Sequence, residues 1–125
     1  MKPVSNKRQS RNREAKPIRD KFAADHPNCM VCGRPADDTH EIARGPARRK
    51  ALDKPFALLR LCRECHDDVH AKWSLGQQYA LKALMDTGNY DRVALNRLRC
   101  REDDAISERE VWMELGAVLR RLLHT

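Results

Sequence analysis

The chain has 125 residues, of which 34% are charged and only 5% aromatic, and its formal net charge is +7 at pH 7. A chain this polar buries a modest core, so a bound metal ion is a natural way to stabilise it. No apolar run is long enough to span a membrane and the N-terminus lacks the apolar stretch of a secretory signal, so we expect a cytoplasmic protein without a membrane partner. The positive charge favours a polyanionic partner, most often nucleic acid, over a merely soluble basic surface.

Residues 1–21 form a basic segment with few apolar side chains. The segment carries eight Lys or Arg against Glu14 and Asp20, and it contains Pro3 and Pro17. Such a segment cannot bury enough apolar surface to offset the entropy of ordering it, so a disordered arm is predicted here. A basic arm can release counterions from a phosphate backbone and add affinity without sequence preference. The alternative is a solvated tail with no specific role.

Two C-x-x-C pairs frame the centre of the chain, Cys29 with Cys32 and Cys62 with Cys65. Each pair places two sulfurs on one tight turn or helix start, and four thiolates suit a closed tetrahedral Zn²⁺ site. A disulfide framework is the alternative, but no signal peptide precedes it and the count of five cysteines is odd. We therefore predict a structural zinc ion in a reducing compartment. The fifth cysteine, Cys100, has no partner at ligand spacing and is expected to be a buried or free thiol.

The residues around these cysteines predict a short hairpin followed by a helix. Strands are expected over residues 36–42 and 56–61, with a basic loop over 43–54 between them. A helix over 63–73 follows at once, and its first turn supplies the last two cysteines. Since a cysteine knuckle, a hairpin and such a helix make up a treble-clef arrangement, we place a zinc-stapled α+β core in residues 22–73.

A helical extension is predicted for residues 74–125. Its first helix begins with a capping box, Ser74 with Gln77, and Ser107 with Glu110 forms a second one. The last helix carries an apolar stripe at helical spacing, which consists of Val111, Leu115, Val118, Leu119 and Leu122. We expect this stripe to form core or dimer contacts, and we expect both tryptophans to lie in the core.

Three histidines could form a second metal site. His66 and His70 are one turn apart on the predicted helix, so they share a face and can bind one ion together. A hairpin packed on that helix would bring His40 towards them. Three imidazoles around one ion, with positions left open, is the layout of a catalytic metal site. The alternative is that these histidines only surround the zinc ion, but four cysteines already fill its coordination sphere.

Three segments of the chain read Cys29-x-x-Cys32, Thr39-His40-Glu41-Ile42 and Leu61-Cys62-x-x-Cys65-His66-x-x-x-His70. This combination resembles the HNH endonucleases, a family of ββα-metal nucleases, and particularly the small zinc-stapled members common in phages and mobile elements. The resemblance implies an α+β fold with a treble-clef core, followed here by C-terminal helices. It also implies metal-dependent hydrolysis of DNA phosphodiester bonds in a bacterial or phage-infected cell. A second divalent ion such as Mg²⁺ or Mn²⁺ would polarise the scissile phosphate and stabilise the leaving 3′ oxygen.

The resemblance implies catalytic roles for His40, Glu41, His66 and His70, of which the two helix histidines ligate the second ion. In one alignment His40 is a further ligand, and Glu41 takes the general-base position where the family usually has His. A carboxyl group with an ordinary pKa near 4.3 is a weak base unless burial raises that pKa. In the other alignment Asp38 and His40 share a face of the strand, so Asp38 ligates the ion and His40 is the base. Both alignments stay open.

The chain departs from the family pattern at Ala57, where an Asn is usual. The basic loop after the first strand is expected to contact nucleic acid through Arg44, Arg48, Arg49 and Lys50. The missing Asn and the missing second His support an alternative function, a non-catalytic zinc-finger module that binds nucleic acid or a protein partner. A third hypothesis is a helical interaction protein in which the final helix pairs two chains as a homodimer.

Overall fold

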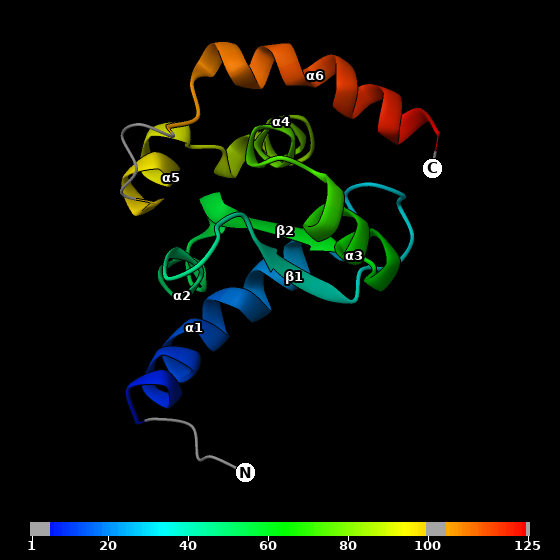
Figure 1. The fold of residues 1–125 in the computed structure, drawn as a ribbon. Coiled ribbons are helices and arrows are strands. Elements are labelled where there is room, and N and C mark those ends of the chain that lie inside the picture. Colours follow the sequence, from blue (N-terminus) through cyan, green and yellow to red (C-terminus); the bar gives the residue numbers. More distant parts are fainter. Residues whose placement is uncertain (1–5, 100–104, 125) are drawn as a thin grey trace.

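The computed structural model describes residues 6–99 and 105–124. These residues form an α+β fold with six α-helices, two short 3-10 helices and one two-stranded sheet (Figure 1), so the predicted α+β class is confirmed. In chain order the elements are α1 (Asn6–Asp25), β1 (Asp38–Glu41), α2 (Ala47–Ala51), η1 (Pro55–Ala57), β2 (Leu58–Leu61), α3 (Arg63–Lys72), α4 (Leu75–Met85), η2 (Thr87–Asn89), α5 (Arg92–Arg99) and α6 (Glu108–Leu123). None of the described helices is both long and apolar enough to cross a membrane.

The hairpin lies at the centre of the molecule. Strands β1 and β2 pair antiparallel, with Asp38 opposite Leu61 and His40 opposite Leu59. The second strand is shorter than predicted because residues 55–57 form the 3-10 turn η1. Pro55 lies at the start of that turn, where its fixed φ and missing N–H suit a helical start better than a strand.

The connection between the strands is more ordered than the sequence predicts. Residues 43–54 were expected to form a loop, but they contain the short helix α2. Gly45 has a φ of +59°, which turns the chain out of β1. Ala51 at the end of α2 is fully buried, so this one small side chain anchors the helix while its basic neighbours remain exposed.

Helix α4 lies between the hairpin and α6, and α1 crosses the opposite side of the hairpin (Figure 1). The capping box predicted at Ser74 and Gln77 is present at the start of α4. Near its end, the fully buried ammonium of Lys82 donates to the carbonyl of Leu58 at 2.7 Å and to Asp86 at 2.6 Å. The bond to Leu58 joins α4 directly to β2. Removing it would leave the carbonyl of Leu58 buried without a partner, which would lower the free energy of unfolding.

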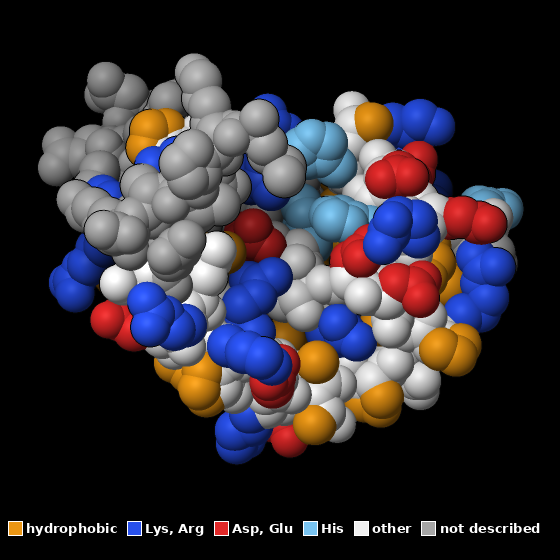
Figure 2. All heavy atoms as spheres, turned by 90° about the horizontal axis from the view of Figure 1, so that it is seen from below, with side chains coloured by type: hydrophobic (Ala, Val, Ile, Leu, Met, Phe, Trp, Pro, Cys, Tyr) orange, Lys and Arg blue, Asp and Glu red, His pale blue; other side chains and the backbone are white. Residues whose placement is uncertain are grey.

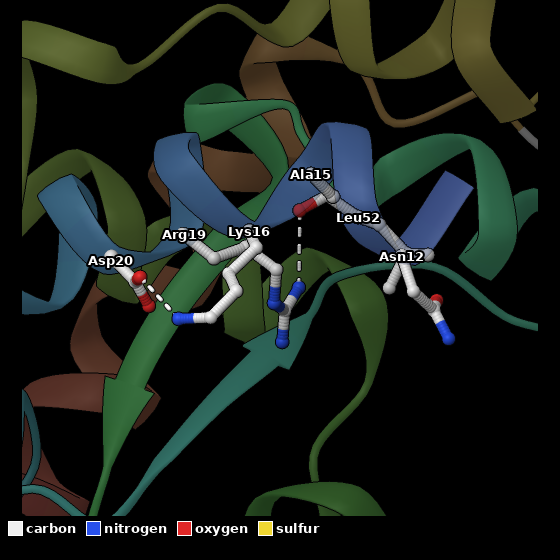
Figure 3. Close-up of a pocket in the computed structure, with 6 residues that line it drawn as sticks. All are labelled: Asn12, Ala15, Lys16, Arg19, Asp20 and Leu52. Atoms are coloured by element: carbon white, nitrogen blue, oxygen red, sulfur yellow. Dashed lines mark hydrogen bonds and ion pairs between the residues drawn. The ribbon is translucent and has the colours of Figure 1, made fainter. Parts of the chain in front are cut away.

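The N-terminal segment is a helix, so the predicted disordered arm is wrong for residues 6–21. Helix α1 is anchored on one face by Ala15, Arg19 and Phe22, whose spacing of four and three residues lines them up. The guanidinium of Arg19 donates to the carbonyl of Leu52 at 3.1 Å (Figure 3) and to the carbonyl of Thr39 at 3.0 Å. Composition alone predicted disorder because it counts Arg19 as a solvent-exposed charge, whereas Arg19 is the side chain that anchors this helix. Residues 1–5 of the predicted arm lie outside the described residues.

Helix α6 covers α4 with one face only. Ser107 caps its start by accepting from the N–H of Glu110, as predicted. Val111 and Val118 are buried, whereas Leu119 is 47% exposed. Trp112 is 67% exposed, so the prediction that it lies in the core is wrong. It sits one residue after Val111 and therefore about 100° around the helix from the buried face.

Candidate functional site

The four predicted zinc ligands lie together. The Sγ atoms of Cys29, Cys32, Cys62 and Cys65 are all within 4.8 Å of one another. The Sγ atoms of Cys32 and Cys62 are 3.7 Å apart, which matches the edge of roughly 3.8 Å expected for a tetrahedron with Zn–S bonds of roughly 2.3 Å. The cluster could therefore hold a metal ion such as zinc.

Local backbone geometry places each cysteine pair. The amide of Gly33 donates to the carbonyl of Cys29 at 2.9 Å, and Gly33 has a φ of +79°, so the first pair sits on a tight turn. Cys62 is the N-cap of α3, where its sulfur accepts from the amide of Cys65 at 3.5 Å. The amide of Met30 donates to the carbonyl of Arg60 at 2.9 Å, which ties the first turn to β2.

The thiols of this cluster differ in their electrostatics. Burial raises the pKa of Cys32, but hydrogen bonds from the side chain and backbone of Arg34, helped by the neighbouring thiols, outweigh it and bring that pKa down to about 6. The side chain of Arg34 lies 3.4 Å from the Sγ of Cys32. Burial raises the pKa of Cys29 and of Cys65. A bound cation would favour the thiolate form of all four sulfurs, so metal binding and deprotonation are linked.

The three predicted histidines also come together. The ring of His40 on β1 lies 5.0 Å from that of His66 and 6.4 Å from that of His70, centroid to centroid, and both partners are on α3. The ring nitrogens of these histidines lie farther from one another than the four sulfurs do. Within residues 6–99 and 105–124, the four-cysteine cluster is the only group of three or more such ligand atoms that close together.

Asp38 joins this histidine cluster. Its Oδ2 lies 2.9 Å from Nδ1 of His66, and the guanidinium of Arg63 donates to both of its oxygens at 2.8 and 3.0 Å. The hydrogen bond from Arg63 is the main reason why the pKa of Asp38 is lowered. Asp38 is therefore a carboxylate at neutral pH, held between the first strand and α3.

Glu41 lies apart from the histidines. Its carboxylate is 3.4 Å from Nη2 of Arg19 on α1 and 3.6 Å from Nη2 of Arg48 on α2, and the side chain is mostly buried. His40 instead contacts α4, where its Nε2 is 2.8 Å from Oε1 of Gln78. The structure thus brings Asp38, but not Glu41, to the histidine cluster.

The predicted nucleic-acid contacts are on the surface. Arg44, Arg48, Arg49 and Lys50 are all exposed. A hollow of about 420 Å³ is lined by Gly45, Pro46, Arg49 and Lys50. Figure 2 shows a face of the molecule on which histidine side chains reach the surface with Lys and Arg side chains around them. Histidine and basic side chains are therefore exposed on the same face of the molecule.

Comparisons with known protein families, with curated proteins and with solved structures gave no match for this chain. Sequence reasoning missed Gln78, because nothing in its local pattern separates it from its neighbour Gln77. It also missed Arg19 as a partner of Glu41, since the two are far apart in sequence. Cys100 lies outside the described residues.

Proposed function

We propose that this protein is a metal-dependent endonuclease of the HNH type that hydrolyses DNA phosphodiester bonds. The observation that carries the proposal is the convergence of Asp38 and His40 from β1 with His66 from α3, next to the four-cysteine cluster. The consecutive order β1, β2 and α3, with cysteines before the hairpin and at the start of α3, supports a ββα-metal core of the treble-clef type.

The donor set supports a divalent ion at this cluster. His66 and His70 are the proposed imidazole ligands, and Asp38 adds a carboxylate. Imidazole nitrogens suit zinc-like ions, whereas carboxylate oxygens suit Mg²⁺ and Mn²⁺, so a mixed set is compatible with several divalent ions. When bound, such an ion would polarise the scissile phosphate and stabilise the leaving oxygen.

In this proposal His40 is the general base. Burial is the main cause of its lowered pKa, which keeps its imidazole neutral and able to accept a proton at neutral pH. Glu41 is the weaker candidate because Arg19 and Arg48 already neutralise its carboxylate. Of the two alignments drawn from the sequence, the geometry favours the one in which Asp38 accompanies the helix ligands and His40 activates water.

DNA is the proposed partner. Helix α2 presents Arg48, Arg49 and Lys50 just beyond β1, and α1 carries most of the remaining excess of positive charge. Because α1 is helical and anchored, its exposed basic side chains, such as those of Arg13 and Lys16, would meet the phosphate backbone at fixed positions. Cleavage of supercoiled plasmid with a panel of Mg²⁺, Mn²⁺, Zn²⁺ and Ni²⁺, compared with an RNA substrate of the same sequence, tests this proposal. No cleavage with any ion would contradict it.

A second function is supported by one observation. Nε2 of His40 and Nδ1 of His66 are already engaged with Gln78 and Asp38, as expected for histidines that only brace a fold. This would suit a non-catalytic zinc module that binds nucleic acid. The metal content separates the two functions: the module should hold one zinc per chain, whereas the nuclease should bind a second divalent ion at the histidines.

We also propose that a second copy of this chain docks on α6. Trp112, Leu119 and Leu123 are exposed there, and with Gly116 they follow the 4-3-4 spacing of a coiled-coil seam. The first turn of α6 is acidic, through Glu108 and Glu110, and its last turn is basic, through Arg120 and Arg121. Two antiparallel copies would therefore place opposite charges side by side.

A further inference from the structure

The side chain of Gln78 connects the two elements that carry the histidine cluster. Its Oε1 is 2.8 Å from Nε2 of His40 on β1, and its Nε2 donates at 3.1 Å to the carbonyl of Trp73. Trp73 is the C-cap residue of α3, the helix of His66. Gln78 is only 2% exposed and His40 6%, so water does not compete for this bond.

The direction of each hydrogen bond follows from what the groups can do. The carbonyl of Trp73 can only accept, so the NH₂ group of Gln78 must face it. The amide oxygen of Gln78 then faces His40, and since that oxygen can only accept, Nε2 of His40 must carry the hydrogen. A neutral imidazole with its hydrogen on Nε2 has its lone pair on Nδ1.

The other ring nitrogen is open. Among the described residues, none forms a hydrogen bond with Nδ1 of His40. Every fully buried side-chain N or O atom in the described part of the chain has a hydrogen-bond partner, so Nδ1, which has none, is not fully buried. Nδ1 is therefore reached by solvent. The ring itself lies against His66, at 5.0 Å between centroids.

We infer that Gln78 is a positioning residue, which holds His40 in the Nε2–H tautomer and so leaves the Nδ1 lone pair free to accept a hydrogen bond or a proton. The side-chain amide of Gln78 is hydrogen-bonded both to the hairpin and to the end of α3. It therefore fixes the orientation of the His40 ring relative to the helix that carries His66. The importance of this for catalysis depends on the proposed nuclease function, but the tautomer itself does not.

The chain offers a matched control for this inference. Gln77 is the adjacent residue and is partly exposed. In the capping box its Oε1 accepts a hydrogen bond from the backbone N–H of Ser74. Gln77→Met therefore removes a helix cap and leaves His40 untouched. Gln78→Met has the same change of side chain but removes the acceptor for Nε2 of His40. Gln78→Glu keeps an oxygen acceptor at that position and serves as the conservative variant.

The test is long-range ¹H–¹⁵N NMR of the imidazole nitrogens in the full-length, zinc-loaded protein, with cleavage kinetics on the same samples. We expect His40 of the wild type and of Gln77→Met to be protonated on Nε2 alone. In Gln78→Met we expect both tautomers of His40 and a kcat lower by about 10- to 100-fold, the usual effect of removing a partner that orients a functional imidazole, with KM nearly unchanged. Gln78→Glu should recover the Nε2–H form.

Two results would overturn the inference. One is a wild-type protein in which His40 carries its hydrogen on Nδ1. The other is a Gln78→Met variant, folded by its near-UV circular dichroism, whose His40 tautomer equals that of Gln77→Met. If Gln78→Met does not fold, the wild-type and Gln78→Glu spectra decide. A wild-type protein with the Nε2–H tautomer and no cleavage would contradict the nuclease proposal while leaving the positioning role of Gln78 intact.

Discussion

Nδ1 of His66 lies 2.9 Å from Oδ2 of Asp38, and this contact joins the first strand of the hairpin to α3. The carboxylate is held in place by two further bonds from Arg63. A carboxylate bonded to one nitrogen of an imidazole fixes the orientation and the tautomer of the ring. The pair therefore gives the histidine cluster a defined geometry before any ion binds.

The first prediction concerns His40. We expect His40→Ala to lower plasmid nicking in Mg²⁺ or Mn²⁺ by at least about 100-fold, the lower end of the contribution of general-base catalysis. Because the change leaves the amide oxygen of Gln78 buried without a partner, we also expect the free energy of unfolding to fall by about 1–3 kcal/mol. Nicking should be measured well below the melting temperature of the variant.

His124→Ala is the matched control for this experiment. His124 is an exposed residue that follows α6, so its loss should change neither nicking nor stability. If folded His40→Ala nicks DNA as fast as His124→Ala, His40 has no part in the mechanism.

The second prediction concerns the cysteine cluster. We expect Cys62→Ser to lose zinc and its cooperative thermal transition, because Cys62 is one of the four predicted thiolate ligands and the free energy of zinc binding is part of the free energy of folding. The helix cap is not lost in this variant, since serine is itself a good N-cap residue. Prolonged treatment of the wild type with a strong chelator should have the same effect. The measurements are metal analysis by mass spectrometry and circular dichroism melting.

Cys100→Ser provides the control, since this cysteine has no partner at ligand spacing in the sequence. It should keep one zinc per chain and the wild-type melting curve. A Cys62→Ser variant that still melts cooperatively at the wild-type temperature would contradict a structural role for the metal.

Short-range patterns predicted the central part of this fold well. The C-x-x-C pairs, the helix after Cys62 and the cap at Ser74 all depend on neighbouring residues, and all are present. The elements that were missed depend on distant partners. Helix α1 is held by bonds from Arg19 to the carbonyls of Thr39 and Leu52, which are distant in sequence, and no local pattern predicts such a bond.

The same distinction applies to the site. Helical spacing predicted that His66 and His70 share a face, and alternation along a strand placed Asp38 with His40. The contact of Arg19 with Glu41 and that of Gln78 with His40 were not predictable, because Arg19 on α1 and Gln78 on α4 are distant in sequence from the hairpin that they contact. These long-range contacts decide which of the two alignments the geometry favours.

The third prediction concerns the anchor of α1. Arg19→Met removes the bonds to the carbonyls of Leu52 and Thr39 and the ion pair with Glu41. We expect faster amide hydrogen exchange throughout residues 10–22 and a weaker affinity for duplex DNA. The measurements are hydrogen exchange by mass spectrometry and a titration of labelled duplex at several salt concentrations.

Arg13→Met removes the same charge from an exposed position of α1. Both variants should lower the salt dependence of binding by at most about one counterion, because each loses one cation. Only Arg19→Met should also speed up exchange in α1. Equal exchange rates in the two variants would show that Arg19 does not hold the helix in place.

The last prediction concerns α6 as a dimer interface. We expect the wild type to dimerise at micromolar concentrations and Trp112→Glu to be monomeric, because a carboxylate within the apolar seam would have to be buried without a partner. Met113→Glu is the control, since Met113 is 70% exposed yet lies about 100° around the helix from Trp112, outside the seam. Sedimentation equilibrium distinguishes the three species. A monomeric wild type, or equal association of the two variants, would exclude this seam as the interface, and cleavage by a monomer would show that the proposed active site is complete within one chain.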